Sequence, residues 1–222
     1  MPKRVIVAID GPAGAGKSTI ARRIAQRLGY VYIDTGAMYR AVGLWALRAG
    51  IPLSDAHRLE QLAQQARIEF ANRQVLLNNE DVTQAIREPE VSQAASQVAS
   101  CPGVRRAMVD EQRRIAASVS CVMEGRDIGT IVFPEAQVKI FLDADPNERV
   151  RRRSAETHED QQAVAKEMAE RDRRDRTRAE APLIQAPDAE YLDSSTLTLE
   201  QVEEAVLKVV RAKTSNGKAM QS

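Results

Sequence analysis

Short apolar runs alternate along this chain with longer segments in which apolar residues recur every three or four positions. Five short runs predict strands, at Val5–Ile9, Tyr30–Ile33, Ser120–Met123, Val138–Leu142 and Ala189–Leu192. The periodic segments predict helices over Lys17–Leu28, Met38–Ala49, Val104–Ala117, Asn147–Glu156 and Leu199–Arg211. Strands that alternate with helices in this way are typical of a parallel α/β sheet.

One stretch interrupts the alternation. Ile68–Phe70 and Val75–Asn78 are short β-like runs on either side of the turn-prone pair Asn72-Arg73, and a helical pattern follows at Pro89–Ser100. We interpret residues 63–100 as a small substrate domain inserted into an α/β core formed by residues 1–62 and 101–212. The polar, aperiodic residues 213–222 predict a disordered tail.

The loop after the first predicted strand has the pattern G-x-x-x-x-G-K-[ST]. A glycine-rich hairpin with a solvated lysine is the alternative, but a strand precedes this loop and a helix follows it, which favours a phosphate-binding loop. Its backbone N–H groups would face phosphate oxygens. Lys17 would act on the outer phosphates with little packing, and the Ser18 hydroxyl suits Mg²⁺. We expect ATP to bind Gly11, Pro12, Ala13, Gly14, Ala15, Gly16, Lys17, Ser18 and Thr19.

Composition excludes several other functions. The chain has 222 residues, with 32 Lys and Arg against 31 Asp and Glu, so we expect no polymeric nucleic acid partner. Two cysteines, Cys101 and Cys121, and two histidines offer neither a disulfide framework nor a zinc site. No apolar run has membrane-spanning length, and the first is too short for a signal peptide. We expect a cytoplasmic monomer that does not bind membranes.

A second group of charges distinguishes among phosphate-loop proteins. The N-K-x-D and D-x-x-G motifs of GTPase switches are absent from the sequence, which leaves small-molecule kinases at this length. Nine Arg and one Lys lie between Arg149 and Arg178, against seven acids. The polar stretch Ser154–Gln162 divides this run, as expected for a lid of about residues 149–178 that closes over phosphates. The alternative is a static, solvated helix with exposed arginines and pairs such as Arg171–Asp175.

Two further motifs carry a family resemblance. Ile33–Arg40 reads I-D-T-G-A-M-Y-R and Glu124–Gly129 reads E-G-R-D-I-G, each following a predicted strand. Together with the phosphate loop, Ala94–Val98 and Arg171–Arg178, they resemble the bacterial cytidylate kinases, from about Val5 to Arg211. The resemblance implies a P-loop nucleoside monophosphate kinase core, an inserted CMP-binding domain and an Arg-rich lid. It also implies transfer of the ATP γ-phosphate to CMP and dCMP, with Mg²⁺, to form CDP and dCDP.

The resemblance implies a role for each matching residue. The cytosine-reading set is Ser96, Arg105 and Asp127, and the residues that hold the acceptor phosphate are Arg40, Arg126 and Arg178. The pentose contacts are Arg171 and Asp175, the pocket walls are Thr35 and Tyr39, and Arg152 belongs with the ATP contacts. The catalytic set is Lys17, Arg126, Asp127 and Arg178. Asp34 and Asp127 are candidates to orient the metal or the acceptor, whereas Glu124 receives no catalytic role.

Two alternatives to this function remain. One is a kinase for AMP, UMP, shikimate or a sugar acid, which the predicted hairpin insert and the I-D-T-G-A-M-Y-R run disfavour. The other is a regulator that binds ATP without turnover, which Lys17, Ser18 and the arginine-rich segment disfavour.

Overall fold

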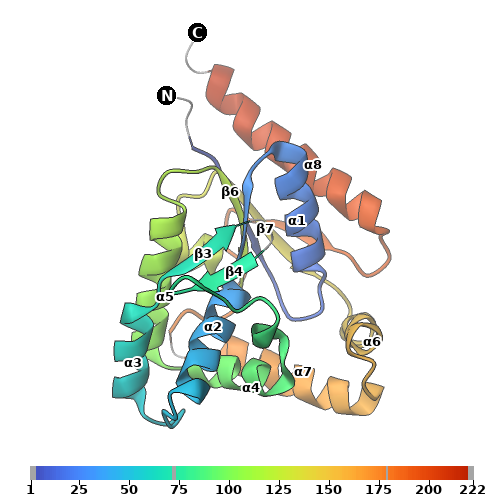
Figure 1. Ribbon diagram of the computed structural model, residues 1–222. Helices are drawn as coiled ribbons and strands as arrows, with labels where there is room; N and C mark the ends of the chain where they lie inside the picture. The colour runs from blue at the N-terminus through green and yellow to red at the C-terminus, as the bar shows by residue number, and fades with distance from the viewer. Residues whose placement is uncertain (1–3, 72–73, 179, 220–222) are drawn as a thin grey trace. The chain divides into compact units, whose positions relative to one another are not determined.

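The chain divides into two compact units. The computed structural model describes residues 4–71, 74–178 and 180–219 (Figure 1). The first unit, called the sheet unit below, comprises Met1–Tyr32 and Val119–Ser222, and the second, called the helical unit, comprises Ile33–Ser118. Each unit is described by itself.

A five-stranded sheet organises the sheet unit. Its strand order is β2 (Val31–Asp34), β6 (Cys121–Gly125), β1 (Ile6–Asp10), β7 (Val138–Asp143) and β8 (Glu190–Asp193). Strand β1 pairs in parallel with β6 on one side and with β7 on the other, and β7 pairs in parallel with β8. The predicted α/β sheet is therefore confirmed, and each strand ends one or two residues later than the sequence pattern indicated. The chain leaves β1 where the strand order reverses, which is where such sheets bind ligands.

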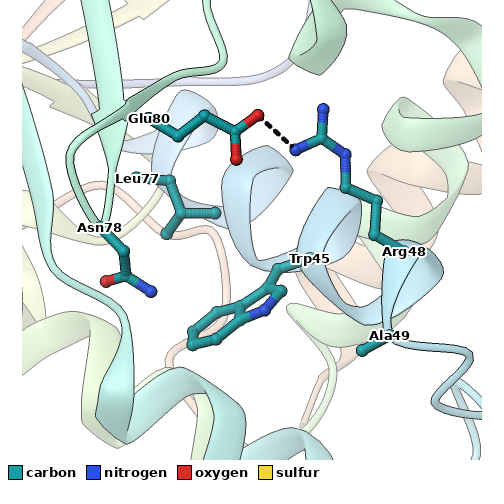
Figure 2. Close-up of a pocket in the computed structure, with 6 residues that line it drawn as sticks. All are labelled: Trp45, Arg48, Ala49, Leu77, Asn78 and Glu80. Atoms are coloured by element: carbon teal, nitrogen blue, oxygen red, sulfur yellow. Dashed lines mark hydrogen bonds and ion pairs between the residues drawn. The ribbon is translucent and has the colours of Figure 1, made fainter.

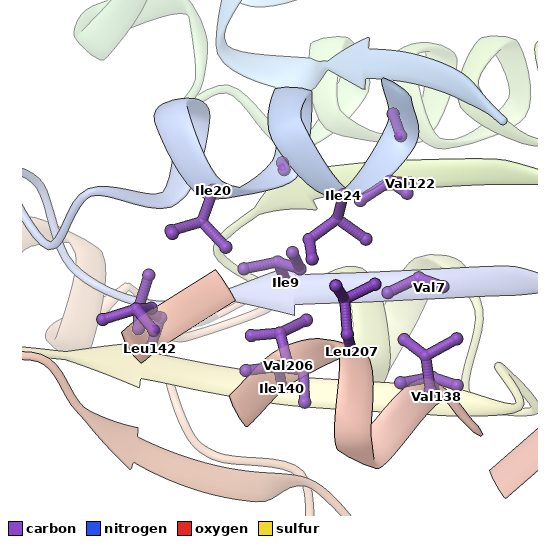
Figure 3. Close-up of a cluster of buried hydrophobic side chains, with 14 of the residues drawn as sticks. Val7, Ile9, Ile20, Ile24, Val122, Val138, Ile140, Leu142, Val206 and Leu207 are labelled. Atoms are coloured by element: carbon purple, nitrogen blue, oxygen red, sulfur yellow. The ribbon is translucent and has the colours of Figure 1, made fainter. Parts of the chain in front are cut away.

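Two helices cover one face of this sheet. Alternate residues of β1, such as Val7 and Ile9, are fully buried against α1 (Lys17–Leu28) and α8 (Leu199–Ala219), as Figure 3 shows. Ile20 and Ile24 of α1 stand one turn apart and enter the same cluster. Each such side chain contributes about 1.5–3 kcal/mol of burial free energy. The remaining elements of the sheet unit are the π-helical stretch η2 (Ile128–Val132), α6 (Pro146–Thr157) and α7 (Gln161–Thr177).

The C-terminal segment differs from the prediction. Helix α8 continues to Ala219, so residues 213–219 are helical where the sequence predicted a disordered tail, and residues 220–222 lie outside the described part. Val206 and Val210 anchor the helix in the core. Extending an anchored helix needs only one residue fixed per added hydrogen bond, which favours continuation of the helix beyond its anchored residues.

The helical unit contains four α-helices and a small antiparallel sheet in its described part. The helices are α2 (Thr35–Arg48), α3 (Ala56–Gln65), α4 (Pro89–Val98) and α5 (Pro102–Ile115), with a 3₁₀ turn η1 at Ala85–Arg87. The predicted hairpin is confirmed as β3 (Ile68–Ala71) and β4 (Gln74–Leu77), and the short β5 (Glu80–Asp81) adds a third strand. The predicted turn residues Asn72-Arg73 lie outside the described residues.

The helical unit is larger than the predicted insert of residues 63–100. Helix α2 packs against α4, and α3 packs against α5, so the flanking helices belong to the same unit. Gly43 allows the first of these contacts, because a Cβ there would lie 3.0 Å from the Ala95 nitrogen. Sequence periodicity identified α2 and α5 as helices but could not show which unit they would join.

Candidate active site

The phosphate loop joins β1 to α1 in a conformation that depends on glycine. Gly11 has φ +150°, and a Cβ at this position would lie only 1.9 Å from the Leu142 carbonyl oxygen. Gly16 has φ +87° and precedes α1, whose first turn has no side-chain cap. The unpaired N–H groups that open such a helix are the usual binding groups for phosphate. The loop therefore has the geometry predicted for it.

Lys17 is buried rather than loosely packed. Lys17 is only 5% exposed, and its Nζ donates a hydrogen bond to the Pro12 carbonyl at 2.6 Å. Burial and the positive charge of Arg126 lower the pKa of Lys17 to about 7. A bound polyphosphate would stabilise the charged ammonium, because it would add negative charge beside it. Ser18 and Thr19, by contrast, are exposed on the first turn of α1.

Arginines of α6 support the phosphate loop. Arg149 is buried and donates to the carbonyls of Ala13 and Ala144, both at 3.1 Å, and to Asp172 of α7 at 2.7 Å. Arg152, which the sequence assigned to ATP, donates to the Ser194 carbonyl at 2.7 Å and lies 4.0 Å from where a Cβ of Gly16 would be. In the sequence, Arg149 is one of a run of arginines. Nothing in that run indicates that Arg149 is the arginine that contacts the loop from a buried position.

A second charged cluster joins the E-G-R-D segment to the end of α7. The Arg126 Nε donates to Asp175 at 2.8 Å, and Arg178 lies 3.6 Å from Asp175 and 3.9 Å from Asp127. Although burial alone would raise it, the charges of Arg126 and Arg171 hold the pKa of Asp175 below its usual value. The structure thus brings together five of the predicted acceptor-side residues within the sheet unit, namely Arg126, Asp127, Arg171, Asp175 and Arg178.

The segment of residues 149–178 has two kinds of arginine. Exposed pairs such as Arg151–Glu148 and Arg173–Glu170 lie along the helix surfaces, as the static alternative predicted. Arg178 differs from these exposed arginines. Its side chain is only 13% exposed, whereas the static alternative required solvated arginines. The interruption predicted at Ser154–Gln162 is also present, since α6 ends at Thr157 and α7 begins at Gln161. Closure of this segment over phosphates stays a prediction.

Glu124 occupies a buried position near the same charges. It accepts a hydrogen bond from the Tyr32 hydroxyl at 2.5 Å and opposes the effect of burial on the Lys17 pKa. Arg22 in turn stacks over the Tyr32 ring at 5.2 Å. Sequence analysis assigned no catalytic role to Glu124, and its electrostatic effect on Lys17 arises only because β6 lies next to β1.

The remaining predicted residues lie in the helical unit. Asp34 caps α2 by accepting the Ala37 N–H, and it also pairs with Arg40, both at 2.9 Å. This cap starts α2 three residues before the predicted Met38, so Asp34 has a structural role besides the orienting role considered for it. Buried Arg105 lies 5.8 Å from the Tyr39 ring centre. Thr35 is buried in the first turn of α2, and Ser96 is half-buried on α4.

A cavity of about 360 Å³ opens at the other end of α2 (Figure 2). Its lining residues are Trp45, Arg48, Ala49, Leu77, Asn78 and Glu80. An ion pair of 2.8 Å between Arg48 and Glu80 crosses its edge. The predicted substrate residues of α2 lie toward its N-terminus, so this cavity is not the pocket that the sequence motifs indicated.

The described residues include neither a cluster of metal-binding side chains nor a membrane-spanning helix. No three His, Cys, Asp or Glu side chains among them gather closely enough to hold a metal ion. In the same residues, no helix combines the length and hydropathy that crossing a bilayer requires.

Comparisons with known sequences show one family. The sequence model described as "Cytidylate kinase" matches residues 7–212. A cytidylate kinase of Solibacter usitatus is 64% identical over 97% of this chain and 96% of its own length. The cytidylate kinase of Geobacillus kaustophilus is 48% identical over 95% and 98%. Among solved structures, TT1252 from Thermus thermophilus has a TM-score of 0.50 at 21% identity, covering 95% of this chain and 97% of its own, which supports the fold alone.

Proposed function

Because this chain belongs to the cytidylate kinase family, we propose that it transfers the γ-phosphate of ATP to CMP and dCMP, forming CDP and dCDP. The observation that carries the proposal is the buried Lys17, held against the phosphate loop and depressed in pKa by burial and by Arg126. A buried lysine held in this way is suited to bind an anionic phosphate. Groups with perturbed pKa values gather at functional sites, which supports this role for Lys17.

The reaction makes one P–O bond and breaks another. An oxygen of the CMP phosphate bonds to the γ-phosphorus, the bond to the bridging oxygen breaks, and ADP leaves with that oxygen. The acceptor phosphate is already anionic near neutral pH, so no residue has to remove a proton from it. Catalysis then consists of positioning and charge neutralisation. In the sheet unit, Lys17, Arg126 and Arg178 provide the positive charges.

Base recognition requires both acceptors and donors, because cytosine presents an exocyclic amine beside its N3 and O2. Asp127 would accept from the amine, and Ser96 and Arg105 would donate, as the family resemblance assigns. Arg171 and Asp175 would contact the pentose, with Arg40 on the acceptor phosphate and Thr35 and Tyr39 as pocket walls. Arg152 would contact ATP beside the loop.

Mg²⁺ fits the residues of the loop. The Ser18 hydroxyl is an exposed hard oxygen on the first turn of α1. Mg²⁺ in such enzymes is held mainly by substrate phosphates and water, so a single protein ligand suffices. When bound, the ion would neutralise charge on the transferred phosphoryl group.

A coupled assay that measures ADP release tests this function. The protein is incubated with ATP and Mg²⁺ and with CMP, dCMP, UMP, AMP or shikimate in turn. We expect turnover with CMP and dCMP that disappears with EDTA. Turnover with shikimate or AMP alone would indicate another small kinase, and ATP binding without any turnover would indicate a regulator. We also propose that the enzyme is a cytoplasmic monomer. Light scattering would test the monomeric state by measuring the molecular mass in solution.

A further inference from the structure

Asp10, the last residue of β1, connects two parts of the sheet unit that are far apart in sequence. It is 5% exposed and directly precedes Gly11 of the phosphate loop. Its Oδ1 accepts the N–H of Ile128 at 2.8 Å, and its Oδ2 accepts the N–H of Gly129 at 2.7 Å. Those two residues begin η2, immediately after Arg126 and Asp127. One carboxylate therefore ties the phosphate loop to the segment that carries two predicted substrate residues.

Asp10 performs a task that usually belongs to the residue before a helical turn. Asp127 holds that position for η2, yet its side chain makes no capping hydrogen bond. An Asp in this position ordinarily accepts the first N–H groups itself. Here Asp10 accepts them from another strand, and Asp127 instead lies 3.9 Å from Arg178. The Asp127 carboxylate is thereby directed toward the charged cluster.

The surroundings of Asp10 are built for this contact. A Cβ on Gly129 would lie 3.4 Å from the Asp10 Oδ2 and 3.2 Å from the Lys139 side chain, so the space is filled by these two charged residues. Lys139 holds the far end of the same segment, because its Nζ donates to the Pro134 carbonyl and pairs with Asp188 at 2.8 Å. Burial raises the pKa of Asp10 to about 6, and the N–H groups of Gly129 and Ile128 oppose that rise.

We propose that Asp10 is a positioning residue for the phosphoryl transfer, which holds Arg126 and Asp127 in place relative to the phosphate loop. This inference rests on the proposed kinase function. The loop itself has other supports, since Arg149 binds the Ala13 carbonyl and Ser194 binds the Ala15 carbonyl. Loss of Asp10 should therefore affect use of CMP more than binding of ATP.

The test is Asp10→Asn, whose amide can accept only one of the two N–H groups. We expect kcat/KM for CMP to fall by on the order of 10–100-fold, because displacing a positioned side chain by about 1 Å has an effect of this size. The KM for ATP should change much less. In an Asp127→Ala background, Asp10→Asn should lower kcat/KM for CMP by a smaller factor. Asp10 acts through the backbone segment that carries Asp127, and effects coupled in this way are non-additive. A wild-type kcat/KM for CMP, or strictly additive losses, would overturn the proposal.

The control is Glu111→Gln in the helical unit. Glu111 is also a buried carboxylate that accepts a distant backbone N–H, from Ile68 at 2.9 Å. The Glu111→Gln substitution should lower the free energy of unfolding and leave kcat/KM for CMP close to wild type. If Asp10→Asn behaves in the same way, its role is structural only and the proposal fails.

Hydrogen exchange separates this inference from the proposed function. Without any substrate, Asp10→Asn should accelerate amide exchange in Ile128–Val132, and unchanged exchange would overturn the proposal even if the protein proves to be another kinase. Absence of CMP turnover in the wild-type protein would instead overturn the function. Should Asp10→Asn fail to fold, Gly129→Ala crowds the same contact and should lower kcat/KM for CMP. A wild-type value for this variant would count against the proposal.

Discussion

The buried charges at the phosphate loop and a buried carboxylate of the helical unit have pKa values shifted in different ways. In the sheet unit, Lys17 and Asp10 have pKa values moved toward neutrality, to about 7 and about 6, with burial the largest cause in each case. In the helical unit, burial would likewise raise the pKa of Glu111, but hydrogen bonds from Arg114 and the Ile68 N–H hold it below its usual value. Both residues are only 5% exposed, but burial outweighs the hydrogen bonds to Asp10, whereas hydrogen bonds and arginine charges outweigh burial at Glu111.

The difference reflects how far the neighbours of each group compensate for its burial. Glu111 is satisfied by two arginines and a backbone N–H of its own unit, as a structural carboxylate should be. Lys17 has one carbonyl partner and the positive charge of Arg126 nearby, and the carboxylates of Glu124 and Asp10 only partly offset burial, so its pKa stays low. Burial with incomplete compensation marks Lys17 as a candidate functional charge, because such groups gather at functional sites.

The largest expected effect is that of Lys17→Ala. We expect turnover to fall by at least on the order of 10²–10³-fold, as when a charge-stabilising donor is removed. Thermal unfolding should stay at or above the wild-type temperature, since a poorly compensated buried charge is lost. The coupled assay and a thermal melt measure both. A folded Lys17→Ala protein with near-normal turnover would contradict the assignment of the phosphate loop.

Asp127→Ala should separate the two substrates. Leaving buried polar partners unpaired costs about 1–3 kcal/mol, so KM for CMP should rise by roughly 5–150-fold. KM for ATP should change little, because the loop contacts of Lys17 and Arg149 remain. Steady-state kinetics with each nucleotide varied in turn measure the two constants. Equal losses for both would mean that Asp127 serves the metal or the fold.

Closure of the arginine-rich segment predicts a change in hydrogen exchange. Amides within Ser154–Arg178 should exchange about tenfold more slowly when ATP and CMP analogues bind together, because bound phosphates relieve repulsion among the arginines. Strand β1 should be protected throughout and serves as the internal control. Equal protection of residues 154–178 with and without nucleotides would support the static, ion-paired helix.

The smallest effect concerns Glu111→Gln, which should lower the free energy of unfolding by about 1–3 kcal/mol near pH 7. The folded pKa lies below the usual 4.5, so this stabilisation is present above pH 4.5 and is lost as the pH falls through the folded value. Urea unfolding at pH 7 and below pH 4 should show the difference from wild type shrinking. Glu60→Gln is the control, since its pair with Arg106 is more exposed and contributes little.

The sheet strands, the phosphate loop and the family could all be predicted from the amino-acid sequence. These features are local, because a strand, a glycine loop and a motif such as E-G-R-D-I-G each depend on a few consecutive residues. Residues 11–18 accordingly have the predicted conformation. The hairpin at Ile68–Leu77 was also recognisable from its two β-like runs.

Which charges are buried, and what they contact, depends on the packing of segments far apart in the sequence. Lys17 was expected to pack little, yet it is buried, and the Arg178 side chain is only 13% exposed, because distant segments close around both. Asp10 reaches Ile128 and Gly129 across 118 and 119 residues of sequence. No local pattern encodes such a pairing. It depends on how β1 lies beside β6 and η2, and burial, pKa and hydrogen-bond partners follow from that arrangement.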